Sequence, residues 1–372
     1  MKIGVPAEVR PGETRVAATP ETVKKLVAGK HSVIVQSGAG ASASFPDDAY
    51  TAAGATLASA SEALSADMVL KVRLPVESEL GVMKRGGVLI GMLEPFNNDG
   101  IAAMNAAGLT AFALEAAPRT TRAQSMDVLS SQANIAGYKA VLMAANTFGK
   151  LLPMMMTAAG TIKAGRVLIL GAGVAGLQAI ATAKRLGAVV EASDVRPAVK
   201  EQIESLGAKF VDVPYETDEE REIAKGVGGY ARPMPASWMQ RQAVAVGERL
   251  KQANIAIATA LIPGRKAPVL ITEEMVKAMQ PGSVILDMAV EQGGNCALSE
   301  LGRTVTKYGV HIIGQPNIPA LVPTDTSALY ARNVLDFLKL VVDKDGNFTL
   351  PVEDDIVAAC LMCAGGEIKR KN

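Results

Sequence analysis

The sequence lacks a disulfide framework, an excess of charge and any long apolar run. Its three cysteines are an odd and small number, which is typical of a reducing compartment. The 38 basic and 37 acidic residues leave a formal charge of +1, so no global attraction to nucleic acid or anionic lipid is expected. No segment provides the roughly 18 apolar residues of a membrane span, and the N-terminus lacks a signal-peptide pattern. We therefore expect a soluble, non-exported protein that does not bind nucleic acid.

Aromatic residues are also scarce, at 4%, whereas glycine is abundant, with 35 residues. Aliphatic strands and helices joined by glycine turns are typical of α/β proteins, and 372 residues leave room for two domains. In the first 125 residues, short β-like runs alternate with helical segments, which predicts a parallel sheet. The predicted strands are 2–5, 32–35, 68–72, 87–93 and 109–113, and the predicted helices are 21–28, 47–53, 61–64 and 98–107.

A second α/β series begins at Arg166, after a proline-free segment, 127–150, that predicts one long connecting helix. Its predicted strands are 166–170, 189–193, 209–213, 255–260, 284–289 and 311–315, with helices from the glycine loop to 186 and over 198–206. The segment 215–239 combines an acidic run with glycines and prolines, and it predicts an inserted mobile loop. After Asn317, a further helix is expected to pack back on the first lobe.

These patterns predict an α/β fold of two doubly wound parallel-sheet domains, each Rossmann-like, with a cleft between them. The first domain is expected to be discontinuous, 1–128 plus 319–372, and the second to span 129–318. The connection between the two lobes would then lie at the cleft.

The strongest motif is G-x-G-x-x-G, formed by Gly171, Gly173 and Gly176 directly after an aliphatic strand and before an Ala-rich helix. Its glycines permit a tight turn, close approach of a pyrophosphate and close packing of helix on sheet. The helix N-terminus then offers unpaired N–H groups to the phosphates. Asp194 ends the next strand, where a carboxylate accepts hydrogen bonds from ribose hydroxyls. The pattern predicts a dinucleotide site; the alternative is a glycine turn in an α/β fold without a ligand.

Asp194 also favours NAD(H) over NADP(H), because its carboxylate would repel the 2′-phosphate of NADP(H). Arg196, two residues later, complicates this preference, since a guanidinium can accommodate that phosphate. We interpret Arg196 as a solvated charge or as one that faces the pyrophosphate.

A polar cluster lies in the connection between the lobes and consists of Arg119, Arg122, Gln124, Asp127 and Ser130. Such side chains can hydrogen-bond a carboxamide and hold a charged ring. They can equally cap a helix, with Ser125 or Asp127 as the N-cap and the arginines in solvent. The residue types alone leave both interpretations open.

Four long segments identify a family: RAQSMDVLSSQANIAGYKAV, PMMMTAAGTIKAGRVLILGAGVAGLQAIATAKRLGAVVEASDVR, ATALIPGRKAPVLITEEMV and GSVILDMAVEQGGNC. They resemble the NAD(H)-binding domain I of proton-translocating NAD(P) transhydrogenase, and the resemblance covers essentially the whole chain. It implies a Re/Si-specific oxidoreductase and translocase, active only in a complex, that transfers hydride directly between NAD(H) here and NADP(H) on a partner domain. A membrane domain would couple this reaction to proton translocation.

The same resemblance implies a separate alpha polypeptide that forms a homodimer. Its partners would be the transhydrogenase membrane domain and the NADP(H)-binding beta subunit. The chain would be cytoplasmic and peripheral, held on the inner face of the cytoplasmic membrane through these partner subunits.

The resemblance also assigns residues. On the nicotinamide side it implies Arg119, Gln124, Asp127 and Ser130. A mobile loop that closes over the nucleotide would act through Tyr230, with hinge glycines Gly226, Gly228 and Gly229; the alternative for Tyr230 is a surface aromatic in a disordered insertion. The adenosine-side contacts would be Val174, Asp194 and Val195, and the strand end formed by Thr259, Ala260 and Leu261 should line the same crevice. Together with Gly171, Gly173, Gly176 and Arg196, these are the predicted cofactor-binding residues.

Alanine dehydrogenase, from the same superfamily, is the main alternative. It shares the RPGExRV start and the DxAVxQGG stretch, and Arg15 and Lys71 match the positions that hold its substrate carboxylate. However, its catalytic histidine aligns with Glu94 and its later aspartate with Glu291, so the acid–base group is missing. His31 and His311 lie elsewhere, and we interpret both as structural. A non-catalytic NAD(H)-sensing module is a third possibility.

Two further motifs are interpreted as structural. Cys360 and Cys363 form a C-x-x-C, but they lie far from any thioredoxin-like strand-to-helix context. Met154, Met155 and Met156 are expected to pack in an apolar core. No metal site is predicted.

Overall fold

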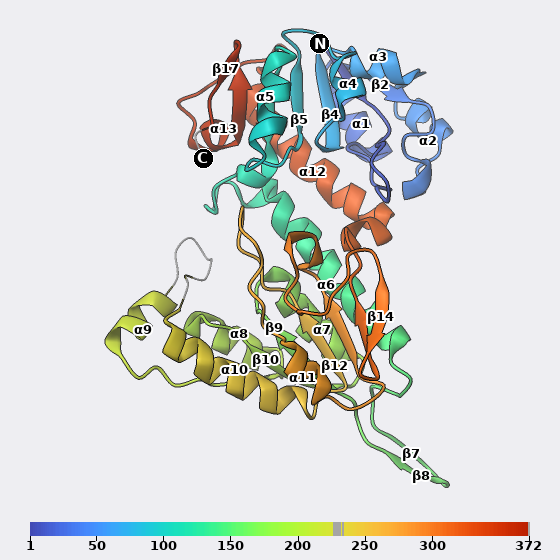
Figure 1. Cartoon of the computed structure of the whole chain (residues 1–372). Helices are drawn as coiled ribbons and strands as arrows, with labels where there is room; N and C mark the ends of the chain where they lie inside the picture. Colours follow the sequence, from blue (N-terminus) through green and yellow to red (C-terminus); the bar gives the residue numbers. More distant parts are fainter. Residues whose placement is uncertain (226–231, 233, 371–372) are drawn as a thin grey trace. The chain divides into compact units, whose positions relative to one another are not determined.

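The computed structural model describes residues 1–225, 232 and 234–370 (Figure 1). The chain divides into two compact units: unit 1 comprises Met1–Gln132 and Pro319–Asn372, and unit 2 comprises Ala133–Ile318. Each unit is a Rossmann-like α/β structure around a largely parallel sheet, which confirms the predicted fold class. Within the described residues, no helix combines the length and hydropathy needed to cross a membrane.

Unit 1 contains an eight-stranded sheet of order β17-β16-β6-β5-β4-β1-β2-β3. The strands are β1 (Lys2–Val5), β2 (Ser32–Gln36), β3 (Thr56–Ala58), β4 (Met68–Arg73), β5 (Val88–Met92), β6 (Thr110–Ala113), β16 (Leu361–Ala364) and β17 (Glu367–Ile368). Strands β1 to β6 pair in parallel, and β16 and β17 add an antiparallel edge. The five strands predicted in this region are confirmed within one residue at most ends, whereas β3 was missed because it is only three residues long.

The helices of unit 1 are α1 (Pro20–Ala28), α2 (Asp47–Ala52), α3 (Ala60–Leu64), α4 (Glu77–Leu80), α5 (Asn98–Ala106), α12 (Pro323–Val341) and α13 (Asp355–Cys360). Helix α12 returns the chain to this unit, as predicted. Its Tyr330, Val334 and Phe337 are buried in the same apolar cluster as the strand residues Ile3 and Phe112. Burial of these large side chains explains why a segment so late in the sequence belongs to the first lobe.

Unit 2 contains a seven-stranded sheet of order β11-β10-β9-β12-β13-β15-β14. The strands are β9 (Arg166–Leu170), β10 (Val189–Ser193), β11 (Lys209–Phe210), β12 (Ile255–Ala258), β13 (Val284–Asp287), β14 (Thr304–Lys307) and β15 (Val310–Ile313). All pair in parallel except β14. The strand order reverses between β9 and β12, so their carboxyl ends form the switch point at which such sheets bind ligands.

The helices around this sheet are α6 (Val128–Thr147), which begins in unit 1 and continues into unit 2, α7 (Val174–Arg185), α8 (Lys200–Ser205), α9 (Asp218–Ala224), α10 (Ala236–Leu250) and α11 (Glu273–Lys277). The long helix predicted over 127–150 is confirmed as α6.

The prediction of one inserted loop over 215–239 is wrong for the described residues. The acidic run forms the first turn of α9, capped by Thr217, and α10 begins at Ala236. Acidic side chains stabilise a helix N-terminus, so the run favours a helix as much as a loop. Trp238 is fully buried and stacks on Tyr215 with ring centroids 5.8 Å apart. Tyr230 and its flanking glycines lie outside the described residues.

The prediction that Met154 to Met156 pack in a core is also wrong. Strands β7 (Met155–Thr157) and β8 (Gly160–Ile162) form a separate hairpin. Met154 is 62% exposed and Met156 is 73% exposed. Methionine composition alone does not distinguish a core segment from an exposed turn, and the tight A-A-G turn decides the local structure.

Candidate nucleotide-binding site

The loop between β9 and α7 uses its three glycines in three ways. Gly171 has a φ of +96°, which favours glycine. A Cβ at Gly176 would lie 1.9 Å from the carbonyl oxygen of Gly171, so only glycine fits there. A Cβ at Gly173 would meet no atom of the described residues within 4 Å. The tight turn, the close packing and the space for an approaching group are therefore divided among Gly171, Gly176 and Gly173.

Helix α7 begins at this open position. Its N-cap is Gly173, which provides no side-chain acceptor, and no acidic residue lies in its first turn. The N–H groups of the first turn are thus left for an anion, and the helix dipole favours negative charge there. Gly137 of α6 supports the turn: a Cβ at Gly137 would lie 2.1 Å from the carbonyl oxygen of Ala175. The sequence analysis did not single out Gly137, because a close approach between two distant segments leaves no local pattern.

Asp194 follows β10 and lies beside the glycine loop. Its Oδ2 accepts a hydrogen bond from the Ala172 N–H at 2.7 Å. Arg196 donates three more: its N–H and Nε to Oδ1, both at 2.9 Å, and its Nη2 to Oδ2 at 2.8 Å. The interpretation of Arg196 as a solvated or pyrophosphate-side charge is therefore wrong in this structure. Its side chain is only 18% exposed, and the bond to Asp194 raises the pKa of the guanidinium.

The end of β12 forms the other side of the loop. The Thr259 hydroxyl donates a hydrogen bond to the carbonyl oxygen of Gly171 at 2.9 Å. Asn295 holds the next residue at both backbone groups: it accepts from the Ala260 N–H at 3.0 Å and donates to the Ala260 carbonyl at 2.9 Å. Leu261 is 42% exposed. Asn295 itself is fully buried, and a buried amide in the Gly-Gly-Asn-Cys segment was a signal that the sequence analysis did not use.

Two more of the predicted adenosine-side residues lie near this loop. Val174 is the first residue of α7. The carbonyl oxygen of Val195, between Asp194 and Arg196, accepts a hydrogen bond from the Tyr215 hydroxyl at 2.9 Å. The backbone that carries the acidic residue is thus fixed from the side of Tyr215.

In unit 1, the polar cluster of Arg119, Arg122, Gln124, Asp127 and Ser130 fits neither helix capping with solvated arginines nor a ligand site completely. Asp127 caps α6: its carboxylate accepts from the Ser130 N–H at 2.9 Å and from the Ser130 hydroxyl at 2.6 Å. Arg122 is not simply solvated, because it forms a two-bond ion pair with Asp354 at 2.6 and 2.9 Å. Arg119 and Gln124 have exposed side chains. The structure brings Asp127 and Ser130 into contact and leaves Gln124 accessible.

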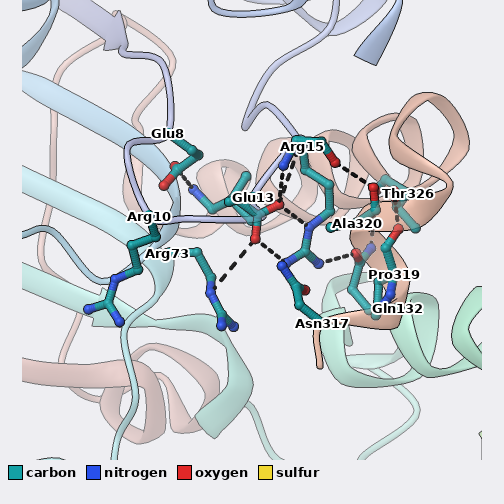
Figure 2. Close-up of polar contacts among 12 residues, drawn as sticks. Glu8, Arg10, Glu13, Arg15, Arg73, Gln132, Asn317, Pro319, Ala320 and Thr326 are labelled. Atoms are coloured by element: carbon teal, nitrogen blue, oxygen red, sulfur yellow. Dashed lines mark hydrogen bonds and ion pairs between the residues drawn. The ribbon is translucent and has the colours of Figure 1, made fainter. Parts of the chain in front are cut away.

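A second charged cluster lies in unit 1, and Figure 2 shows its part around Glu13 and Arg15. Arg15 donates two hydrogen bonds of 2.7 Å to Glu13 and a third of 2.6 Å to Gln132. Lys71 lies 2.6 Å from Glu79 and 3.3 Å from Glu8. Arg15 and Lys71 are 2% and 1% exposed. Both cations, which the sequence analysis matches to substrate-carboxylate positions of alanine dehydrogenase, are thus held by carboxylates of unit 1 itself.

Glu94 is the residue that the sequence analysis aligns with the catalytic histidine of alanine dehydrogenase. Its backbone is left-handed, with a φ of +58°. Its N–H donates to Glu115 Oε1 at 2.6 Å, and its own carboxylate lies 3.3 Å from Arg10. Burial raises the pKa of Glu115 to about 7. Glu291 accepts a hydrogen bond from the Asn317 N–H at 3.0 Å, so it is also committed to a structural contact.

The remaining titratable side chains have structural surroundings. His311 lies 3.1 Å from the Thr306 hydroxyl, and burial lowers the pKa of His31. Burial raises the thiol pKa of Cys360 to about 12 and that of Cys363 to about 11, which disfavours the reactive thiolate. In the described portion of the chain, no group of three or more His, Cys, Asp or Glu could hold a metal ion.

Comparisons with known proteins show the family to which the chain belongs. The sequence matches the family "Alanine dehydrogenase/PNT, N-terminal domain" over residues 4–136 and "Alanine dehydrogenase/PNT, C-terminal domain" over residues 140–371. It is 54% identical to a Rhodospirillum rubrum protein named as the first part of the NAD(P) transhydrogenase subunit alpha, over 99% of this chain and 97% of that protein. It is 30% identical to alanine dehydrogenase of Bacillus subtilis, over 99% of this chain and 92% of the enzyme.

A solved structure, the transhydrogenase from Sinorhizobium meliloti, is similar over 99% of this chain and 100% of that chain, with 46% identity and a TM-score of 0.89. Two proteins can share a fold at much lower sequence identity, so identities of 46% and 54% over the full length indicate a closer relationship than a common fold. The chain therefore belongs to the alanine dehydrogenase/PNT family.

Proposed function

We propose that this chain is the NAD(H)-binding subunit of a proton-translocating NAD(P) transhydrogenase. The observation that carries the proposal is the loop after β9, in which Gly173 leaves open space at the uncapped N-terminus of α7. This arrangement fits a pyrophosphate, which needs backbone N–H donors and no obstructing Cβ. Asp194, at the end of the neighbouring strand, fits the adenosine ribose and favours NAD(H) over NADP(H).

The bound nicotinamide would supply the chemistry by giving up or accepting a hydride. The residues of this chain would bind and orient it. Gln124 and Asp127 would hydrogen-bond the nicotinamide carboxamide or its ribose, with Arg119 and Ser130 holding the surrounding loop. Tyr230, which lies outside the described residues, would close over the nucleotide. Direct transfer between two nicotinamides needs no general acid or base, and this agrees with Glu94 and Glu291 at the positions of the alanine dehydrogenase acid–base groups.

The name of one relative supports a complex. The Rhodospirillum rubrum relative is named as one portion of a subunit alpha, a name that supports partner subunits for this chain. We propose an NADP(H)-binding beta subunit as the hydride partner, with Re/Si-specific transfer, and a membrane domain that couples the transfer to proton translocation. The chain would act as a homodimer held at the inner face of the cytoplasmic membrane through these partners.

The decisive experiment measures hydride transfer with and without an NADP(H)-loaded beta-subunit domain. The isolated chain should bind NADH more tightly than NADPH, and it should show no oxidation of NADH by pyruvate in the presence of ammonium and no reduction of NAD⁺ by alanine. Addition of the partner domain should start hydride transfer. Turnover with alanine or pyruvate by the isolated chain would favour an alanine dehydrogenase, and NADH binding without transfer to the partner would favour a sensing module.

A further inference from the structure

The carboxylate proposed to hold the ribose is fully occupied by this chain. A carboxylate has about four acceptor positions. Asp194 uses them for the Ala172 N–H, the Arg196 N–H, and the Nε and Nη2 groups of Arg196, at 2.7–2.9 Å. Ribose hydroxyls would need two of these positions to donate hydrogen bonds.

The four donors are not equally replaceable. The Ala172 and Arg196 N–H groups are backbone donors, and the backbone between Asp194 and Arg196 is fixed by the bond from Tyr215 to the Val195 carbonyl. The Arg196 guanidinium, in contrast, can leave Asp194 by side-chain rotation, because it is the end of a flexible side chain. Its 18% exposure places part of the side chain at the surface.

We propose that Arg196 is a specificity-determining latch: its guanidinium occupies the ribose-binding positions of Asp194 and must swing away when NAD(H) binds. This inference rests on the proposed function, because it places the adenosine ribose of NAD(H) at Asp194. The latch lowers the affinity for NADH by the free energy of the ion pair that must open. It also neutralises Asp194, so it weakens the repulsion of a 2′-phosphate. Arg196 therefore narrows the preference for NADH over NADPH.

The test replaces Arg196 by methionine, which keeps the apolar stem and removes the guanidinium. R196M should bind NADH about three- to tenfold more tightly than the unchanged chain, since the competing ion pair is gone. It should bind NADPH more weakly, because Asp194 then faces the 2′-phosphate without a counter-charge. The ratio of the two affinities should rise roughly tenfold or more.

Lys200→Met is the matched control. Lys200 lies on α8, four residues after Arg196, and pairs with Asp212 rather than with Asp194. K200M also removes one positive charge, so it reports the general loss of attraction for an anionic nucleotide. It should leave NADH affinity unchanged or slightly weaker. The opposite signs expected for R196M and K200M separate a latch from a simple charge effect.

A second measurement does not depend on a variant. The Nε–H of Arg196 donates to Asp194 in the free protein, so its proton should exchange slowly with solvent. In nuclear magnetic resonance spectra of arginine-labelled protein, assigned with R196M, saturation with NADH should abolish this protection.

Two results would overturn the latch: R196M that binds NADH no more tightly than the unchanged chain, or an Arg196 Nε–H that stays protected in NADH-saturated protein. Either can occur while the unchanged chain still binds NADH and transfers hydride with its partner, and then the proposed function stands. Failure of the unchanged chain to bind NADH would instead remove the proposed function and the latch together.

Discussion

The two units contain the same kind of largely parallel sheet, but the polar groups around the two sheets are arranged in opposite ways. In unit 2, β9 ends in a glycine loop that leaves the N-terminus of α7 uncapped and open at Gly173. In unit 1, charged side chains on β4, on the segment after β1 and on α4 are buried and paired with one another, as Lys71 is with Glu8 and Glu79. Open backbone donors create a binding site, whereas paired buried charges consume the polar groups that a ligand would use. Fold similarity between the units therefore does not imply similar function.

The largest effect is expected in unit 1, on stability. Lys71→Met should lower the free energy of unfolding by about 3–5 kcal/mol, because it leaves Glu8 and Glu79 buried without their counter-charge. Urea denaturation measures this. Lys84→Met is the control, since Lys84 is half exposed in its pair with Asp67 and should cost less than about 1 kcal/mol. Equal losses in the two variants would show that burial does not distinguish them.

The buried carboxyl of Glu115 in unit 1 is expected to make the stability of the protein depend on pH. Burial raises its pKa from 4.5 to about 7, so the folded state keeps a proton that the unfolded state has lost. The stability contributed by this group is therefore full below about pH 4.5 and is lost as pH rises towards about 7. Glu115→Gln should remove that decline and raise the free energy of unfolding at pH 8 by up to about 3 kcal/mol.

The measurement is urea denaturation of both proteins from pH 4.5 to pH 8, and the exposed Glu77→Gln of α4 serves as the control. If the free energy of unfolding depends on pH in the same way for E115Q and for the unchanged chain, Glu115 is not the source of the expected decline. NADH affinity should not change in either variant, because neither Glu115 nor Glu77 is proposed to contact the nucleotide.

In unit 2, we expect the main effect of a substitution on nucleotide affinity rather than on stability. Gly173→Leu should weaken binding of both NADH and NADPH by roughly 100-fold, or about 2.7 kcal/mol, because its side chain would fill the space left for the pyrophosphate. Gly149→Leu is the control, since a Cβ there also meets no described atom within 4 Å, and Gly149 lies two residues beyond the C-terminal end of α6. Fluorescence titration measures the affinities and circular dichroism the stability. Unchanged affinity in G173L would contradict a nucleotide at this loop.

Local patterns made most of the fold predictable. Strands and their order in the chain follow from apolar runs, and the positions of Gly171, Gly176 and Asp194 follow from the spacing of one motif. Contacts between distant segments could not be predicted in this way. Gly137 is needed because α6 approaches Ala175, and Asn295 matters because its side chain binds the backbone of Ala260 and of Pro268. The pairing of Arg196 depends on side-chain torsions, which the sequence does not specify.

Two residues of unit 1 are expected to act on hydride transfer rather than on stability. Gln124 and Asp127 belong to unit 1, yet we propose that they orient the nicotinamide. Gln124→Ala and Asp127→Asn should slow hydride transfer to the NADP(H)-binding partner about tenfold or more, while NADH affinity changes less than about threefold. A rate loss that exceeds the affinity loss indicates an interaction made mainly in the transition state, since the adenosine and pyrophosphate contacts supply most of the binding energy.

Asp127→Asn separates this role from helix capping. Asparagine is also a good N-cap and keeps an acceptor for the Ser130 N–H, so the stability of α6 should be retained. Ser125→Ala is the control, because Ser125 is exposed, adjoins Gln124 and has no proposed contact with the nucleotide. Single-turnover transfer rates and NADH titrations on the same samples give the two quantities. If D127N and Q124A transfer hydride as fast as S125A, unit 1 contributes stability alone, and orientation of the nicotinamide must come from unit 2 or from the partner.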